Sequence, residues 1–328
     1  MQTVANLETD LPRTERANAQ YAGLDTWASA DILDAILQAQ VQAIKSVGPA
    51  LLALAEAVDA IVTRLERGGR LIYVGAGSSG LMAQVDALEL SGTYGISADQ
   101  VKVVLAGGAA SLVQIIGDAE DDSESAVAAL EALQLASRDC VVAVTASGRT
   151  PFAVAALEYA RAQAALCIGI ACNAGTPVLT RADHALLIET PPEVVSGSTR
   201  MNAGTAQKCA LNMLSTLLAI RLGHVHDGLM VNMAVANAKL EQRAVNIVLQ
   251  VTGADDAAAR AALDASGNNI KQAILIASGA DTKQAAQILE NRAGNVRAAL
   301  AELAACQAKA RDALEAGEAR PKKGSPHA

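Results

Sequence analysis

Three short segments of the sequence combine hydroxyl side chains with glycine in a pattern that could bind an anion. They are Gly77-Ser78-Ser79-Gly80, Ser147-Gly148-Arg149-Thr150 and Ser196-Gly197-Ser198-Thr199-Arg200. Each segment follows a strand-like apolar run and precedes a helical pattern, so unpaired N–H groups and the positive end of a helix dipole would point into it. Serine and threonine are also preferred helix N-caps, so any one segment could be a cap only. Together the three favour a shared phosphate site.

The first segment is part of GAGSSG, residues 75–80, which also matches the dinucleotide fingerprint G-x-G-x-x-G. That fingerprint needs an acidic residue about 20 positions later to hold a ribose. The next strand candidate, Val101–Leu105, is followed by Ala106-Gly107-Gly108 and has no carboxylate there. A sugar phosphate is therefore the favoured ligand over a dinucleotide. A glycine turn with a purely structural role remains an alternative.

Composition excludes several other classes of protein. The 328 residues are 52% apolar but only 2% aromatic, and the formal net charge is −8. A negative chain without a basic, aromatic-rich cluster does not suit a nucleic-acid partner. The five cysteines have no metal-ligand spacing and lie in apolar runs, so we expect reduced core thiols in a cytoplasmic protein.

The amino terminus is polar and does not resemble a signal peptide. We also see no apolar run long and uninterrupted enough to span a membrane. The sequence therefore predicts a cytoplasmic protein that has no membrane partner.

Apolar strands alternate with helical patterns through the middle of the chain. The predicted strands are 70–74, 101–105, 139–145, 166–171 and 184–188, with helices between them that include 109–117 and 123–135. Two further helices, 31–48 and 50–66, precede the first strand. This alternation predicts an α/β fold with a parallel five-stranded sheet, whose carboxyl-end loops bind ligands.

From residue 201 onward the pattern is purely helical, with predicted helices at 201–222 and 229–251 followed by short alanine-rich helices. The segments DAAARAALDASGNNIKQAI and TKQAAQILENRAGNVRAAL resemble each other, as two helical hairpins would. We expect a polar amino-terminal arm with two helices in residues 1–60, a sugar-phosphate-binding domain in 61–223 and a helical domain in 224–316. The charged segment 317–328 is expected to be disordered.

Taken together, the motifs resemble those of the sugar isomerase (SIS) domain superfamily and, within it, the N-acetylmuramic acid 6-phosphate etherase family. The resemblance covers nearly the whole chain. It rests on TERAN, GGRLIYVGAGSSG, AEDD, ASGRTPFAVAALEYA, EVVSGSTRMNAGTAQKCALNMLST and LMVNMAVANAKLEQRAVNIV. SGSTRM with GTAQK is the specific part, whereas GAGSSG alone is weak.

This resemblance implies cleavage of the ether between D-lactate and carbon 3 of an amino sugar phosphate, by elimination and then hydration, in cell-wall sugar recycling. That chemistry needs two proton-transfer groups and no cofactor or metal, and paired carboxylates can serve. The family spacing matches Glu89 as the acid for the departing lactyl oxygen and Glu120 as the group that moves the carbon 2 proton. By themselves, Glu89 would be an ordinary solvated residue and Glu120 part of an acidic helix start.

The resemblance also implies a set of substrate-binding residues in the three hydroxyl-rich loops and beside them. These are Gly77, Ser78, Ser79, Ser147, Gly148, Thr150, Glu193, Ser198 and Thr199. The chain departs from the family pattern at Leu81, Leu90-Ser91-Gly92, Ala174, Asn202 and Asn232. These changes leave open a related amino sugar phosphate as substrate, a sugar-phosphate sensor without catalysis, or an aldose–ketose isomerase.

The predicted helix at 201–222 is apolar almost all round, which suits burial in a core or in a subunit interface. We therefore expect a homodimer, as the resemblance also implies.

Overall fold

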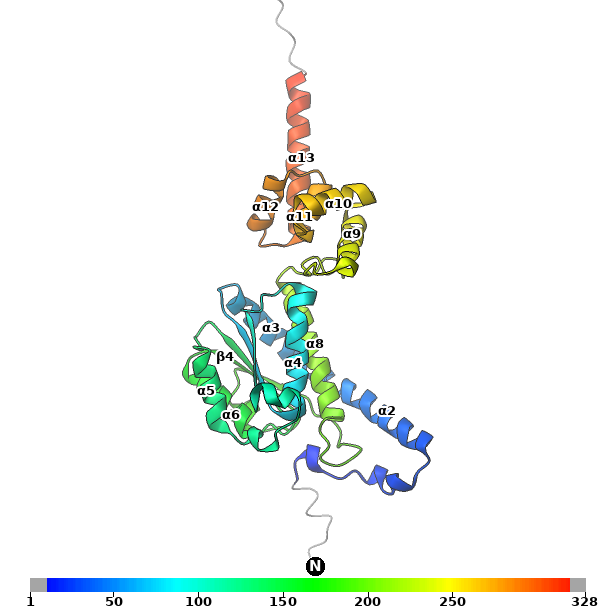
Figure 1. Cartoon of the computed structure of the whole chain (residues 1–328), viewed down its shortest axis with the longest axis vertical. Helices are drawn as coiled ribbons and strands as arrows, with labels where there is room; N and C mark the ends of the chain where they lie inside the picture. The colour runs from blue at the N-terminus through cyan, green and yellow to red at the C-terminus, as the bar shows by residue number, and fades with distance from the viewer. Residues whose placement is uncertain (1–10, 319–328) are drawn as a thin grey trace, which may run out of the picture. The chain divides into compact units, whose positions relative to one another are not determined.

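The computed structural model describes residues 11–318, and its centre is a five-stranded parallel sheet in the order β2-β1-β3-β4-β5 (Figure 1). The strands are Leu71–Gly75 (β1), Val101–Leu105 (β2), Cys140–Val144 (β3), Leu166–Ala171 (β4) and His184–Leu187 (β5). Register places Gly75 of β1 between Leu105 and Val144, so these strands end together. The predicted α/β class and parallel sheet are confirmed.

Helices cover both faces of this sheet (Figure 1). On one face lie α5 (Ser123–Ala132) and α6 (Pro151–Ala162). The other face is covered by α3 (Leu51–Leu65), α4 (Gly77–Tyr94) and α8 (Asn202–Arg221), and α2 (Ser29–Lys45) packs on α8. A short helix, α7 (Pro177–Thr180), lies between β4 and β5.

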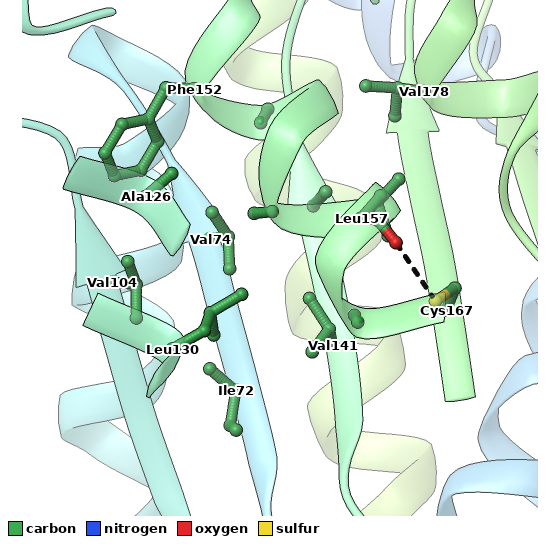
Figure 2. Close-up of a cluster of buried hydrophobic side chains, with 14 of the residues drawn as sticks. Ile72, Val74, Val104, Ala126, Leu130, Val141, Phe152, Leu157, Cys167 and Val178 are labelled. Carbon is green, nitrogen blue, oxygen red and sulfur yellow. Dashed lines mark hydrogen bonds between the residues drawn. The ribbon is translucent and has the colours of Figure 1, made fainter. Parts of the chain in front are cut away.

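Alternate strand residues form the core under α5 and α6 (Figure 2). Ile72 and Val141 point toward this face, where Leu130 of α5 and Phe152 and Leu157 of α6 meet them at 2% exposure or less. Burial of each such side chain contributes about 1.5–3 kcal/mol. Because both faces are covered, the strands are apolar throughout rather than alternating.

The cysteines are only partly as expected. Cys140, Cys167 and Cys172 are buried, and burial raises the pKa of each thiol to about 12. The Cys167 thiol lies 3.7 Å from the Leu157 carbonyl oxygen, to which it donates (Figure 2). Cys306, however, is exposed, so the expectation of five core thiols is wrong for that residue.

Two predicted helices are shorter than expected. In place of a helix over 109–117, only a 3-10 turn forms at Gly108–Leu112, because the β-branched Val113, Ile115 and Ile116 that follow have low helix propensity. A second 3-10 turn lies at Gly117–Glu120. The helix expected from 229 begins later, as α9 (Ala238–Thr252), where the Asn237 side chain accepts from the Leu240 N–H.

The segment Ser29–Leu65 is long and apolar enough, by composition, to cross a membrane, so our expectation that no such run exists is too strong. In the fold it is two helices, α2 with 17 residues and α3 with 15, separated by a 3-10 turn at Gly48–Ala50. Each is shorter than the roughly 20 residues that a span needs. Part of its apolar surface packs inside the protein, because Leu54, Val58 and Ile61 of α3 are buried.

The structure divides into two compact units, one formed by most of residues up to Arg221 and one by Leu222 onward with Thr93–Gly95. The second unit contains α9 and two helical hairpins, α10 (Asp256–Ala265) with α11 (Ile270–Ala277) and α12 (Thr282–Asn291) with α13 (Val296–Glu318). The expected internal repeat is evident, because Asp255 and Asp281 cap α10 and α12 alike, and Asn269 and Asn295 accept from the first turns of α11 and α13.

The four-part division expected from the sequence stays a prediction. Within the expected disordered tail, residues 317 and 318 end α13, and residues 319–328 lie outside the described part of the chain.

A buried lysine lies inside the second unit. Lys271 of α11 is 7% exposed, and none of the described residues forms a hydrogen bond or ion pair with its ammonium. Burial lowers the pKa of Lys271 to about 8. Burial, and then the Lys271 charge, lower the pKa of His224 to about 4, so this histidine is neutral at pH 7. The unit therefore carries an uncompensated charge at neutral pH.

We expect Lys271→Met to raise the stability of the second unit at pH 7, by up to about 3 kcal/mol for a pKa lowered to this extent. A base whose folded pKa is lowered binds fewer protons than the unfolded chain between the two pKa values, so wild-type stability rises from about pH 8 upward. The gain of the variant should therefore shrink at pH 10. Calorimetric unfolding at both pH values measures this, with the exposed Lys283→Met as control; an equal gain at both would contradict it.

Candidate active site

A cavity of about 480 Å³ opens at the carboxyl ends of β1 and β3. It is lined by residues from the amino-terminal arm, the start of α4, the segment between β2 and α5, the loop before α6 and the loop before α8. They are Glu15, Ala76, Gly77, Ser78, Ser79, Ile115, Glu120, Asp121, Thr145, Ala146, Ser147, Arg149, Thr150, Pro151, Gly197 and Thr199. All three hydroxyl-rich segments thus contribute to one cavity.

The first segment differs from the expected irregular turn, because Gly77–Gly80 forms the first turn of α4. Two glycines allow it to start directly at the strand end. A Cβ at Gly75 would lie 2.8 Å from the Gly80 Cα, and a Cβ at Gly80 would lie 2.8 Å from the Gly75 carbonyl carbon. Only residues without a side chain permit this approach. The N-terminus of α4, with its N–H groups, is thereby held against the cavity.

The second segment forms a cluster of hydroxyl groups. The Thr145 Oγ1 atom lies 2.8 Å from the Thr150 Oγ1 and 3.3 Å from the Ser147 Oγ. Gly148 has φ +72° and does not line the cavity; a Cβ there would lie 2.2 Å from the Thr176 Oγ1. Gly148 therefore lets the turn pack on Thr176, while the neutral hydroxyls face the ligand space.

Ser79 is bound to a second buried side chain. Its hydroxyl donates to the Oε1 of Gln207 on α8 at 2.9 Å, and Gln207 is fully buried. With its proton engaged, Ser79 offers the cavity an acceptor, whereas Ser78 lies on the same turn at intermediate exposure. Gln207 thus couples the cavity to the core helix α8.

Of the third segment, Gly197 and Thr199 line the cavity and Ser198 does not. Glu193 is 1% exposed, and its carboxylate accepts the N–H groups of Asn202 at 2.7 Å and Ala203 at 3.0 Å. Burial raises the pKa of Glu193, against the lowering effect of these two N–H donors. This geometry is that of a cap on α8 rather than of a ligand contact.

The two predicted catalytic carboxylates occupy different places. Glu120, in the 3-10 turn after β2, lines the cavity together with the hydroxyl-rich segments. Glu89 lies on the exposed side of α4 and does not line it. About three helical turns, or ~16 Å along the axis, separate Glu89 from Ser78. Within one chain, the two carboxylates do not meet at the cavity.

Sequence reasoning did not assign four cavity residues with polar or charged side chains: Glu15, Asp121, Thr145 and Arg149. Asp121 and Thr145 adjoin predicted site residues and could have been inferred from that. Glu15 could not, because tertiary contacts bring the arm to the cavity: the Asn173 Nδ2 donates to the Thr14 Oγ1 and the Ser196 Oγ donates to the Glu15 carbonyl. No group of three or more His, Cys, Asp or Glu side chains in the described part of the chain has metal-binding geometry.

Comparison with known proteins now identifies the family. Two family models match, for the glucokinase regulatory protein N-terminal SIS domain at residues 53–161 and for the SIS domain at 112–217. N-acetylmuramic acid 6-phosphate etherase from Deinococcus radiodurans is 42% identical over 90% of this chain and 97% of that protein. The chain belongs to the N-acetylmuramic acid 6-phosphate etherase family.

Other members of the etherase family match to a similar extent. N-acetylmuramic acid 6-phosphate etherase 1 from Vibrio cholerae is 43% identical over 90% of this chain and 99% of that protein, and the Klebsiella aerogenes etherase is 41% identical over 88% and 96%. Among solved structures, a phosphoheptose isomerase from Francisella tularensis matches with a TM-score of 0.46 and 19% identity, covering 59% of this chain and 100% of that chain.

Two departures from the etherase family pattern have structural roles. The Asn202 side chain is buried, where its Nδ2 donates to the Pro192 carbonyl and its Oδ1 accepts from Gln40. Asn232 belongs to the second unit, where its Nδ2 donates to the Tyr94 carbonyl. Neither side chain lines the cavity, so neither change alters its walls.

The Asp86 carboxyl, one turn before Glu89, lies in a buried network. It accepts from the Tyr73 hydroxyl at 2.9 Å, the Asn212 Nδ2 at 2.7 Å and the Ser215 Oγ at 2.9 Å. Burial raises the pKa of Asp86, against these donors, and the nearby Glu89 charge raises it further. The network joins α4 to β1 and α8, which fixes the helix that carries Glu89.

We expect the double variant Ser78→Ala with Ser147→Ala to bind glucosamine 6-phosphate more weakly. Each neutral hydrogen bond lost costs roughly 0.5–1.5 kcal/mol, so the dissociation constant should rise about five- to hundredfold. Isothermal titration calorimetry gives this ratio. Ser91→Ala, an exposed serine on α4 outside the cavity, is the control. An unchanged constant in the double variant would make the hydroxyls structural only.

Proposed function

We propose that this chain cleaves the D-lactyl ether of N-acetylmuramic acid 6-phosphate, giving N-acetylglucosamine 6-phosphate and D-lactate. One observation carries the proposal: Glu120 lines the same cavity as Ser78, Ser147 and Thr150. A carboxylate beside a phosphate site can act on carbons a few bonds from that phosphate. The etherase relatives, similar over most of their length, share the expected chemistry.

The reaction needs two proton transfers in the open-chain aldehyde form of the sugar. The phosphate lies at the N-terminus of α4 and among the hydroxyls of Thr145, Ser147 and Thr150. The Glu120 carboxylate removes the proton at carbon 2, and the carbon 3–oxygen bond breaks as an acid protonates the lactyl oxygen. Water then adds at carbon 3 of the unsaturated aldehyde, and a proton returns to carbon 2.

The acid is expected to be Glu89, which does not line the cavity of its own chain because it lies about three helical turns from Ser78. We assign it to Glu89 of a second copy, whose α4 would approach the cavity across a two-fold axis. A two-fold dimer forms the same contact twice, so each of two cavities receives one Glu89.

Exposed apolar side chains support this arrangement at both ends of the contact. Val85 and Leu88, next to Glu89 on α4, are 50% and 69% exposed. Leu112 and Val113 are 54% and 92% exposed, and Ile115 close by lines the cavity. Apolar residues clustered on the surface in this way are typical of a covered interface. The apolar groove between α2 and α8, with Ile44, Met213 and Ile220, adds further area for a dimer.

Lactate release tests the function directly. The wild-type protein incubated with N-acetylmuramic acid 6-phosphate should release D-lactate, and Glu120→Gln should release at least about 10²-fold less. Wild-type protein that binds the sugar phosphate but releases no lactate would instead support a sensor, the alternative favoured by the match to the glucokinase regulatory protein domain.

Mixing two inactive variants tests the shared site. Glu89→Gln and Glu120→Gln should each be inactive alone, but unfolding and refolding them together should restore about a quarter of wild-type activity. Half of the dimers are then mixed, and each mixed dimer has one site with both carboxylates. Refolding each variant alone is the control. No recovery, in a sample shown to contain mixed dimers, would contradict a site formed by two chains.

A further inference from the structure

A second cleft, of about 310 Å³, lies next to the cavity. Its walls come from the arm at residues 11–16, from the loop after β4 with Asn173, and from Arg149. Arg149 lines both the cleft and the cavity, so one side chain lies between them. None of the residues assigned to phosphate binding or proton transfer lines this cleft.

The two spaces have opposite charge. Three arginines, Arg13, Arg16 and Arg149, line the cleft with one carboxylate, Glu189. The cavity is lined by the carboxylates of Glu15, Glu120 and Asp121 with Arg149 as its only cationic side chain among the described residues. An anionic group that needs a formal positive charge is therefore favoured in the cleft rather than in the cavity.

Arg13 and Arg149 have hydrogen-bond donors available for a ligand. Arg13 has one ion pair, to Glu189 at 3.9 Å, and both side chains are about half exposed. The Arg16 Nε donates to the Leu11 carbonyl, which holds the arm in place. Among the described residues, none accepts a hydrogen bond from the Arg149 guanidinium or pairs with it. Guanidinium groups bind carboxylates through two parallel hydrogen bonds.

The floor of the cleft contains a buried side chain that is hydrogen-bonded to the protein. Asn173 is 8% exposed, and its Nδ2 donates to the Thr14 Oγ1 at 3.1 Å and to the Ala146 carbonyl at 3.2 Å. Its Oδ1 is buried with no hydrogen-bond partner in the described part of the chain. A carboxylate has no proton to donate to this oxygen, so Asn173 shapes the floor by holding the loop after β4 to the arm, and the arginines supply the donors.

We propose that this cleft is a carboxylate subsite, which holds the lactyl carboxylate while the phosphate of the same ligand lies at the N-terminus of α4. The inference rests on the proposed function. The substrate has two anionic groups, the phosphate and the carboxylate, whereas the sugar product keeps only the phosphate. Arg149 and Arg13 are then specificity-determining residues that distinguish the substrate from its sugar product.

Binding constants for substrate and product test this. In a Glu120→Gln background, which prevents turnover, Arg149→Gln and Arg13→Gln should each weaken binding of N-acetylmuramic acid 6-phosphate about ten- to hundredfold, as expected for a hydrogen bond to a charged group. Binding of N-acetylglucosamine 6-phosphate, measured in the same variants, should change less than about twofold. Arg181→Gln is the matched control, an arginine that pairs with Glu158 away from the cleft.

Three results would overturn the proposal. An equal loss of affinity for substrate and product in Arg149→Gln would mean that Arg149 binds the phosphate. Unchanged binding of both ligands would leave the cleft without a ligand role. A second equivalent of N-acetylglucosamine 6-phosphate bound to wild type and lost in Arg13→Gln would make the cleft a site for a separate anion. Lactate release by the wild-type protein is measured alongside: its absence removes the proposed function, whereas its presence with any of these three results removes the carboxylate subsite alone.

Discussion

The site depends on the contact between two glycines, Gly75 at the end of β1 and Gly80 in the first turn of α4. With the Gly80 Cα so near the strand, α4 begins two residues after β1 ends, and its N-terminal N–H groups lie at the edge of the sheet. The register of the sheet places the end of β3 beside the end of β1. The hydroxyl cluster of Thr145, Ser147 and Thr150, which follows β3, therefore lies next to the N-terminus of α4. A side chain at either glycine would push the N-terminus of α4 away from β1 and change the wall of the cavity.

Neutral hydroxyl groups and positively charged side chains lie in different parts of the site. In the function we propose, neutral hydroxyls and a helix end hold the phosphate, and the Glu120 carboxylate in the same cavity forms no ion pair with a described residue. The positively charged Arg149 lies at the edge of the cavity, where it also lines the arginine-rich cleft. A base that must take a proton from carbon suits surroundings of this kind better than a salt bridge.

The sequence predicted the parallel sheet and the three hydroxyl-rich loops, since buried strands and glycine turns have strong local signatures. The sequence did not predict the features that depend on tertiary contacts. Glu15 reaches the cavity only because Thr14 and Ser196 anchor the arm. Residues 109–117 gave a helical pattern, but only the 3-10 turn Gly108–Leu112 forms there. The distance between Glu89 and the cavity could not be read from a spacing along the chain, because it depends on where α4 points. The carboxylate pair came from the resemblance to the family, and in the fold Glu120 lines the cavity whereas Glu89 of the same chain does not.

The central claim is that Glu120 and Glu89 have separate tasks, the first at carbon 2 and the second at the departing lactyl oxygen. Proton NMR of N-acetylmuramic acid 6-phosphate in deuterated water tests it most directly. Glu89→Gln should still replace the carbon 2 hydrogen with deuterium while releasing no lactate, because deprotonation precedes departure of the lactyl group. Glu120→Gln should lose both exchange and release. Loss of exchange in Glu89→Gln, or retained exchange in Glu120→Gln, would contradict this division of roles.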